Sequence, residues 1–298
     1  MNQALNAWNA QYGRMDESLA IDGKTICNAI DETGRQTHIM SAIGHHSGQC
    51  YTQNKVGTLP VKGSDEEKQT NEIKIAAPML DAIEIEGRTV TADAVLTQRD
   101  LAQYLVEERG ANYHFTVKGN QSALLEAIAF FFQSNPNVAD FTQIGNGEHG
   151  RIETRKIWVT IKLNHYLDFP HVSQAFMIER ESIDKKTDET SQEVVYGITS
   201  TSADQTNPEQ ILADNRGHWR VESCHYIIDW NFDEDRSQIR TGFGPENITR
   251  LRRFAIGLLK SKKNNETIPE MMKKLLLNMR AVFDYLKMTR NSNTLSMS

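Results

Sequence analysis

The sequence has few of the residues that build disulfide frameworks, metal ribbons or membrane spans. Only 3 of its 298 residues are cysteines, at positions 27, 50 and 224, and no two of them form a C-x-x-C pair. This spacing argues against a zinc ribbon and a disulfide framework, so we expect reduced thiols, small core side chains and a cytoplasmic location. No stretch approaches the roughly 18–20 apolar residues of a membrane span, and the first residues, "MNQALNAWNAQYGRMDES", lack the basic-then-apolar order of a secretion signal.

Positive charge is scarce in most of the chain and concentrated near its end. From Arg236 to Ser298 there are 13 lysines and arginines and 4 acidic residues, whereas residues 1–235 hold 20 basic and 35 acidic residues. This asymmetry indicates an acidic body with a basic C-terminal face suited to a polyanion. Solvated lysines on terminal helices would give the same balance, so charge alone leaves both interpretations open.

The first half of the chain alternates strand and helix signals. Apolar runs and turn residues predict three antiparallel strands within 18–57, the first one ending at Asp22 because Gly23 turns the backbone away. We expect a helix over 64–83, capped by Ser64 and kinked or divided at Pro78. A strand over 88–95, a helix over 97–110, a strand from 111 and a helix from 122 follow.

The second half begins with a change of pattern. Strand-like segments separated by polar turns, such as "DKKTDETS", fill residues 140–200 and predict a β-rich block inserted into an α/β frame. A long helix over 207–232 is expected next, with Asn207 before it and Pro208 at its first position. Two amphipathic basic helices, over 244–262 and 268–286, complete the chain.

Two aspartates follow predicted strands of the first half, Asp22 in "SLAIDGKTIC" and Asp93 in "RTVTADAV". Three antiparallel strands, a helix and a fourth strand form an order in which the first and fourth strands lie side by side. That pairing would bring the two carboxylates together, and a divalent cation such as magnesium would remove their repulsion. The alternative is two unrelated turn aspartates.

The predicted helix over 207–232 carries a second set of candidate ligands. His218, Glu222, His225 and Asp229 have the spacing of one helical stripe. A solvated stripe would have the same spacing, and the arrangement differs from the H-E-x-x-H zinc motif. Two strand carboxylates and one helix carboxylate would suffice for two-metal phosphoryl transfer.

Five motifs in order, "AIDGKT", "VTADAVLTQ", "YHFTVKGNQ", "HGRIETR" and "RGHWRVES" with the following "HYIIDWNFDEDRSQIR", resemble the DDE transposases of bacterial insertion sequences, in particular the ISAs-type group with its H-repeat-associated proteins. The resemblance implies an α/β RNase H-like core, a mixed sheet flanked by helices, with a β-rich insertion and basic C-terminal helices. It implies a magnesium-dependent triad of Asp22, Asp93 and Glu222, with manganese as a substitute. The expected segments are a remnant (1–17), the first part of the core (18–135), the insertion (136–205), the helix with the third acid (206–240) and the basic helices (241–298).

Further polar residues are candidates for contact with double-stranded DNA, both element ends and target. These are Lys118, Asn120, Gln121, His149, Arg151, Arg155, Arg216, Trp219, Arg236, Arg240, Arg250, Arg252 and Arg253. Lysine and amide groups after a core strand suit phosphates or base edges, and Trp219 suits stacking on an unpaired base. The alternatives are an ordinary polar turn at 118–121, a solvated strand face at 149–155 and a core position for Trp219.

Two departures from the family pattern bear on function. Related transposases often carry a lysine seven positions after the glutamate, where this sequence has Asp229, so no lysine phosphate clamp is assigned there. The group usually has an N-terminal domain of several tens of residues, so the resemblance predicts a shortened chain with impaired end recognition. We therefore expect a nucleoid-associated transposase that cleaves and transfers strands as a homodimer assembled on DNA. A DNA-binding remnant and another RNase H-like nuclease are the alternatives.

Overall fold

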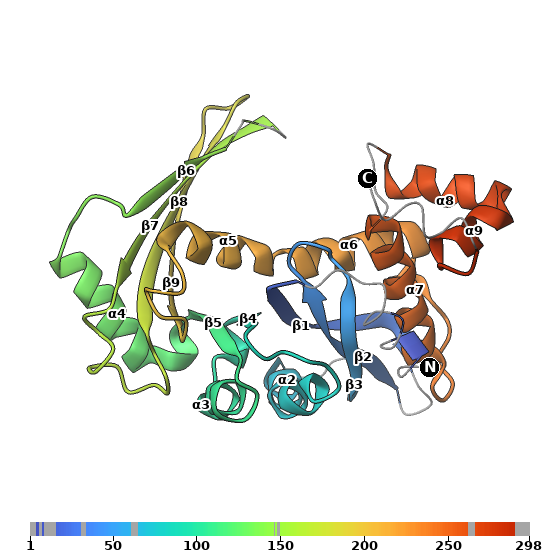
Figure 1. The fold of residues 1–298 in the computed structure, drawn as a ribbon, viewed down its shortest axis with the longest axis horizontal. Coiled ribbons are helices and arrows are strands. Elements are labelled where there is room, and N and C mark those ends of the chain that lie inside the picture. Colours follow the sequence, from blue (N-terminus) through green and yellow to red (C-terminus); the bar gives the residue numbers. More distant parts are fainter. Residues whose placement is uncertain are drawn as a thin grey trace. The chain divides into compact units, whose positions relative to one another are not determined.

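The structure is a computed structural model. It describes residues 4–5, 8, 16–30, 34–60, 65–145, 147, 150–261 and 266–289. The chain divides into two compact units: a central unit of residues 17–22 and 72–219, and a terminal unit of residues 1–16, 23–71 and 220–298 (Figure 1). Strand β1 (Ser18–Ile30) is divided between the two units: its residues up to Asp22 belong to the central unit, and its residues from Gly23 belong to the terminal unit.

The central unit is built on a mixed sheet in the order β1, β4, β5, β9, β8, β7, β6. The strands other than β1 are β4 (Thr89–Ala92), β5 (Asn112–Val117), β6 (Phe141–Ile144), β7 (Arg151–Thr160), β8 (Gln174–Asp184) and β9 (Thr190–Thr199). Strands β1, β4 and β5 are parallel, and the β5–β9 pair and the later pairs are antiparallel. Because β9 pairs with β5, the segment expected to form a β-rich insertion extends the core sheet.

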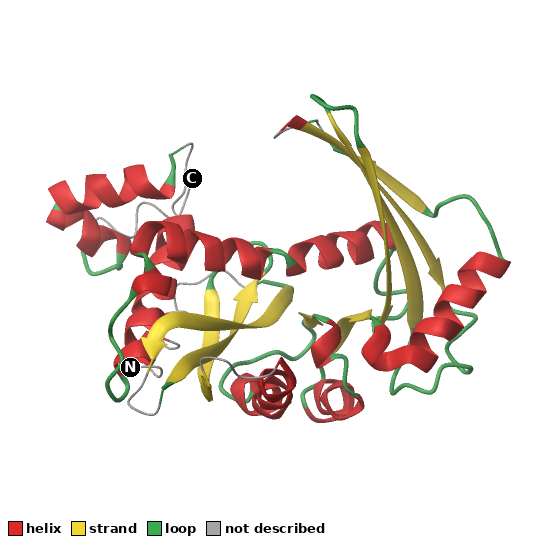
Figure 2. Cartoon of the chain, turned by 180° about the vertical axis from the view of Figure 1, so that it is seen from behind, coloured by secondary structure: helices red, strands yellow, loops and turns green. Residues whose placement is uncertain are grey.

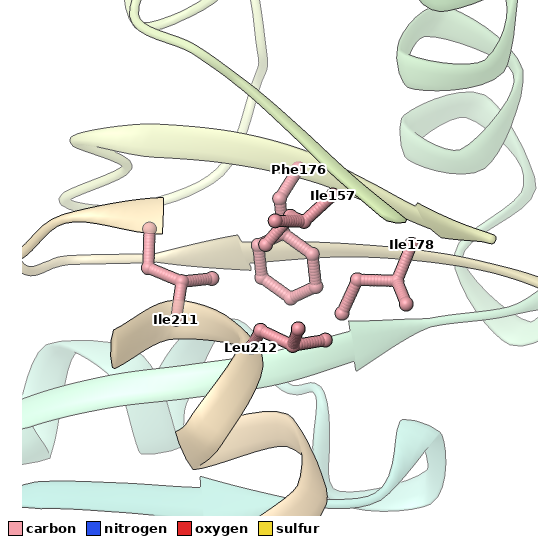
Figure 3. Close-up of a cluster of buried hydrophobic side chains, with 5 residues drawn as sticks. All are labelled: Ile157, Phe176, Ile178, Ile211 and Leu212. Atoms are coloured by element: carbon pink, nitrogen blue, oxygen red, sulfur yellow. The ribbon is translucent and has the colours of Figure 1, made fainter. Parts of the chain in front are cut away.

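Two helices cover the faces of the antiparallel strands. Helix α4 (Ser122–Ser134) contacts β8 and β9, and helix α5 (Pro208–His218) contacts β7 on the other side (Figures 1 and 2). Ile157, Phe176 and Ile178 point from the strands toward Ile211 and Leu212 of α5 (Figure 3). Each of these five side chains is at most 3% exposed. Burying a side chain of this size contributes about 1.5–3 kcal/mol, so this cluster fixes α5 on the sheet.

The connections of the central unit are short helical segments. They are η1 (Ala94–Leu96), α3 (Arg99–Gln103), the π-helical turn η2 (Tyr104–Glu108) and η3 (Gly119–Gln121). The predicted end of the helix at Gly110 is confirmed by its positive φ of 58°, a conformation that glycine adopts without strain. Helix α2 (Asp65–Leu80) continues through Pro78, which stands in its last turn, so the expected division at Pro78 was wrong. The expected cap Ser64 lies outside the described residues.

The terminal unit begins with the predicted meander. Strands β2 (Arg35–Gly44) and β3 (Cys50–Pro60) pair in antiparallel register, and β1 lies next to β2. The expectation that β1 ends at Asp22 was wrong, because its pairing with β4 ends at Ile21 while the strand continues to Ile30. The neighbouring β2 supplies backbone partners for this continuation, so Gly23 does not turn the chain.

Among the described residues of the terminal unit, the following helical segments come next: α6 (Arg220–Phe232), η5 (Glu234–Arg236), α7 (Gly244–Ser261), α8 (Ile268–Leu277) and α9 (Met279–Tyr285). The long helix predicted over 207–232 is broken at Trp219, whose N–H bonds back to the carbonyls of Arg216 and Gly217. Glycine is a weak helix former, so Gly217 favours a break there. Helix α5 begins as predicted, since the Asn207 side chain caps it by accepting a hydrogen bond from the N–H of Gln210. The predicted last helix is likewise divided at Asn278, which caps α9.

The three cysteines are free and differ in exposure. Cys224 is buried and Cys50 partly buried, as expected for core positions, whereas Cys27 is exposed and does not fit that expectation. Burial raises the pKa of the Cys50 thiol to about 11, which keeps it protonated at neutral pH. No helix in the described part of the chain is long and apolar enough to span a membrane.

Candidate active site

Asp22 and Asp93 stand at equivalent positions of neighbouring parallel strands. Ser18 to Ile21 of β1 pair with Thr89 to Ala92 of β4, and Ile21 pairs with Ala92. The aspartates are the next residues of the two strands, and paired strands lie roughly 4.8 Å apart. The predicted pairing of the two strands is therefore confirmed, and it brings the backbone positions of Asp22 and Asp93, the residues after the paired segments, next to each other.

The surroundings of Asp93 oppose a bare negative charge. Burial raises the pKa of its carboxyl, and the carboxylate of Glu72 on α2 raises the pKa further. The opposing influences are weaker: the Leu96 N–H, 3.3 Å from Oδ1, and the Lys118 ammonium both lower the pKa. A half-buried carboxyl beside a second carboxylate gains from a bound cation, because the cation compensates both lost hydration and repulsion.

The donor set fits a hard divalent cation that keeps water or phosphate oxygens among its ligands. Asp22 and Asp93 supply two carboxylates, and Glu72 is a buried acid close enough to affect the pKa of Asp93. Within the described residues, no three His, Cys, Asp or Glu side chains are grouped as a ready-made metal cage. Sequence reasoning missed Glu72, since its motif "NEIKIAAP" reads as an ordinary helix face.

The turn between β5 and α4 is tied to the loop that follows Asp93. The Asn120 side chain donates to the carbonyl of Ala94 over 2.6 Å, and the Gln121 side chain donates to that of Thr97 over 2.9 Å. These two amides hold the protein's own backbone, and their predicted contact with DNA stays a prediction. Lys118 remains exposed beside the Asp93 carboxylate, where a cation suits a phosphate group.

His218, the last residue of α5, packs under the same strand. Its Nδ1 lies 3.1 Å from the Thr91 hydroxyl, and Thr91 precedes Asp93 by two residues. Burial lowers the pKa of His218 to about 4, so the imidazole is neutral near pH 7. His218 therefore fixes α5 to β4 without adding charge to the site.

Glu222 lies in the terminal unit, exposed in the first turn of α6. Since the helix is broken at Trp219, the predicted stripe is not continuous: His218 belongs to α5, whereas Glu222, His225 and Asp229 belong to α6. The position near a helix N-terminus favours a charged carboxylate there. The role of Glu222 as third acid remains a prediction from its motif.

Asp229, at the position where related transposases often have a lysine, is paired with Lys24 of β1. The Lys24 ammonium lies 2.8 Å from Asp229 and 3.1 Å from Asp235, and its side chain is 10% exposed. Burial lowers the pKa of Lys24, but the hydrogen bonds to the two carboxylates outweigh this and raise it. This double ion pair joins β1, two residues after Asp22, to α6 and η5 within the terminal unit.

Three of the predicted DNA-binding residues line one pocket of the central unit. Arg155, Arg216 and Trp219 surround a cavity of about 270 Å³ together with Arg180, Asn215 and Glu193. Arg155 is hydrogen-bonded to Glu153 and Arg216 to Gln143, so their guanidinium groups are held in place. Trp219 is 53% exposed and is no core residue. The pocket combines three arginines and an aromatic ring, groups that bind phosphates and bases, with one acid, Glu193, which lies 3.5 Å from Arg180.

The other predicted contacts in this unit are separate or undescribed. Arg151 is exposed and lies 4.0 Å from Asp184 at another place on β7 and β8, and His149 lies outside the described residues.

The basic residues near the C-terminus divide into exposed and buried groups. Arg236 and Arg240 are exposed, and Arg236 has a loose ion pair with Asp233 at 3.7 Å. Arg253 is 3% exposed and donates to the Gln53 side chain over 2.9 Å.

Its neighbours on α7 are also engaged inside the unit. Arg250 pairs with Glu246, and Arg252 lies 3.5 Å from the buried Glu234. The predicted DNA contacts of Arg250, Arg252 and Arg253 do not fit this placement, because the three side chains are used in the packing of α7.

The comparisons with known proteins identify the family of this chain. Residues 33–256 match the family model described as "Transposase DDE domain", which covers most of the chain. The chain belongs to the transposase DDE domain family. "Putative transposase YncI" of Escherichia coli O157:H7 is 29% identical over 276 residues, which are 88% of this chain and 67% of that protein. "H repeat-associated putative transposase YhhI" of Escherichia coli K12 is 30% identical over 260 residues, 82% of this chain and 64% of that protein.

This DDE domain chain thus spans about two thirds of the length of these curated relatives. Among solved structures, the piggyBac transposase synaptic complex with hairpin DNA matches 92% of this chain and 54% of that chain. Its TM-score is 0.50 at 10% identity, so the likeness concerns the fold, as expected for an α/β RNase H-like core. DDE transposases in general depend on divalent metal ions, which suits the paired aspartates.

Proposed function

We propose that this chain is the catalytic part of a DNA transposase that cleaves DNA strands by metal-dependent phosphoryl transfer. The observation that carries the proposal is the parallel register of β1 and β4, which sets Asp22 and Asp93 side by side. Family membership supplies the reaction class. Magnesium is the proposed ion, with manganese as a substitute, because both accept carboxylate and water oxygens.

The residues divide the work of a phosphoryl transfer. Asp22 and Asp93 would hold the metal, and with two ions bound, one would activate the attacking oxygen and the other would stabilise the leaving oxygen. Glu222 is proposed as the third carboxylate on the strength of its motif. Lys118, exposed beside Asp93, would neutralise the phosphate that is attacked. Such sites act mainly by positioning and charge neutralisation, so they need no covalent protein nucleophile.

Transposition would proceed by cleavage at an element end, followed by attack of the freed 3′ hydroxyl on target DNA. We propose double-stranded DNA as partner, with two copies of the chain assembled on it. The pocket of Arg155, Arg180 and Arg216 would hold a phosphate and the exposed Arg236 and Arg240 further ones. Support comes from the family and from the positive side chains themselves.

The test is a cleavage assay on labelled duplexes that contain the flanking inverted repeats, with magnesium, manganese or a chelator. We expect metal-dependent nicking that falls at least a hundredfold in Asp22→Asn, Asp93→Asn and Glu222→Gln, since each change removes ligand charge at constant size. Asp188→Asn is the matched control, because Asp188 is an exposed turn residue with a φ of 55°, which asparagine adopts readily.

The outcomes separate the candidate functions. Nicking followed by joining to a target plasmid supports a transposase, whereas nicking without joining indicates another RNase H-like nuclease. DNA binding without nicking in either metal indicates a remnant that only binds. Near-normal nicking by one of the variants would remove that residue from the catalytic set.

A further inference from the structure

Helix α6 exposes two large aromatic rings on the face that carries Glu222. Tyr226 is 64% exposed and Trp230 is 72% exposed, whereas Val221, Cys224 and Ile228 of the same helix are buried. Residues 222, 226 and 230 are spaced four apart, so they lie along one side of the helix. The aromatic face, defined here as Tyr226 and Trp230, therefore points away from the core of the terminal unit.

The two rings are arranged as a pair. Their centroids are 6.2 Å apart and their planes differ by 17°. Helix α6 packs on the unit through its buried residues Val221, Cys224 and Ile228, so its packing does not require aromatic side chains at the two exposed positions. Exposed apolar rings lose contact with water only when something covers them, so the pair is a candidate binding surface.

The extent of the aromatic face favours a small flat ligand over a second protein chain. A fully buried tyrosine or tryptophan removes about 150–250 Å² of surface from water. Two partly exposed rings therefore offer less than about 500 Å² for contact. A stable protein interface needs about 800 Å² from each partner. A nucleic-acid base is flat and covers one ring face, and stacking on aromatic side chains is the common way of binding unpaired bases.

The position of the two rings along α6 relates them to Glu222 and to two exposed arginines. One turn of helix rises about 5.4 Å, so Tyr226 stands about one turn and Trp230 about two turns from Glu222. Exposed arginines, Arg236 and Arg240, follow Trp230 in the chain and can meet the backbone of the same strand. Bases inside a duplex have their faces covered by neighbours, so only unpaired bases can use the rings.

We propose that Tyr226 and Trp230 form a stacking surface for unpaired bases of the DNA strand that is cleaved. This inference rests on the proposed function in its choice of DNA as ligand. It adds a preference for unpaired over paired DNA, and it assigns that preference to two residues on α6.

The test compares binding of the full-length chain to three probes at fixed salt, without divalent metal. The probes are a single-stranded oligonucleotide, the duplex of the same sequence, and a single strand of abasic sugars that keeps the phosphates. The variants are Tyr226→Ser, Trp230→Ser and the double variant. The matched control is Phe130→Ser, since Phe130 is 72% exposed on helix α4 of the central unit.

We expect affinity for the single strand to fall roughly tenfold for each ring removed. Affinity for the duplex and for the abasic strand should change less than twofold, and Phe130→Ser should match the parent on all three probes. Tryptophan fluorescence of the parent should be quenched by the single strand, and this quenching should be much smaller in Trp230→Ser.

Three results would overturn the inference. The first is equal loss of affinity for all probes, because that indicates general damage or a phosphate contact. The second is unchanged binding of the single strand by the double variant. The third is a change from dimer to monomer in the variants without DNA, which would assign the face to self-association. Since no metal is present, failure of catalysis would leave these measurements unaffected.

Discussion

We predict that His218 makes the stability of the protein depend on pH between about 4 and 6.5. The folded protein holds this imidazole neutral, because burial lowers its pKa from 6.5 to about 4. In the unfolded chain the ring takes up a proton at its ordinary pKa. Between the two values the unfolded state therefore binds more protons, so stability rises with pH through this window.

The size of the effect follows from the difference between 6.5 and about 4. One pKa unit corresponds to about 1.4 kcal/mol, so His218 contributes stability of about 3 kcal/mol above pH 6.5 that is lost by pH 4. Few small domains exceed about 15 kcal/mol in total, so the loss is a large share.

The perturbation that isolates this group is His218→Asn. Asparagine places an amide near the position of Nδ1 and so keeps a partner for the Thr91 hydroxyl, 3.1 Å away in the parent. Urea unfolding of parent and variant is measured at steps from pH 7 to pH 4. The difference in unfolding free energy, parent minus variant, should fall by about 3 kcal/mol over this range.

Taking the difference removes the contributions of the carboxylates that titrate in both proteins. A difference that stays constant within about 1 kcal/mol, the error of such extrapolations, would refute the reasoning. It would mean that the folded protein protonates His218 as readily as the unfolded chain.

Three further outcomes are expected. Lys24→Met should lower the unfolding free energy by about 1–3 kcal/mol, since it leaves Asp229 and Asp235 without their shared ammonium. Lys24→Arg keeps a cation and should lose less stability, and equal urea midpoints for the two variants would contradict this. Arg253→Ala should lower the melting temperature without selectively weakening DNA binding, and unchanged melting would return Arg253 to the set of DNA contacts. Burial raises the pKa of Asp214, so Asp214→Asn should gain stability relative to the parent as pH rises from 4 to 7, and a gain in the opposite direction would refute the assignment.

Much of the site was predictable because its signals are local in sequence. An apolar run followed by an aspartate, twice, with three elements in between, predicted the pairing of β1 with β4, and this pairing is what the structure shows. Strand alternation likewise predicted β2 and β3, and Gly110 predicted a helix end. The family followed from short motifs, since their order along the chain is itself a property of the sequence.

The tertiary structure decided what each polar group touches. Asn120 and Gln121 look like DNA ligands in sequence, yet they bond to backbone carbonyls after Asp93. The basic residues near the C-terminus look alike in composition, yet Arg253 is buried, whereas Arg240 is exposed.

The physical reason lies in the range of the interactions. Helix and strand patterns depend on neighbours within a few residues, so the sequence by itself determined the order of elements and the positions of the two strand aspartates. The burial of a side chain depends on which distant segments pack around it. Glu72 beside Asp93 and Lys24 between Asp229 and Asp235 are therefore known only from the folded chain.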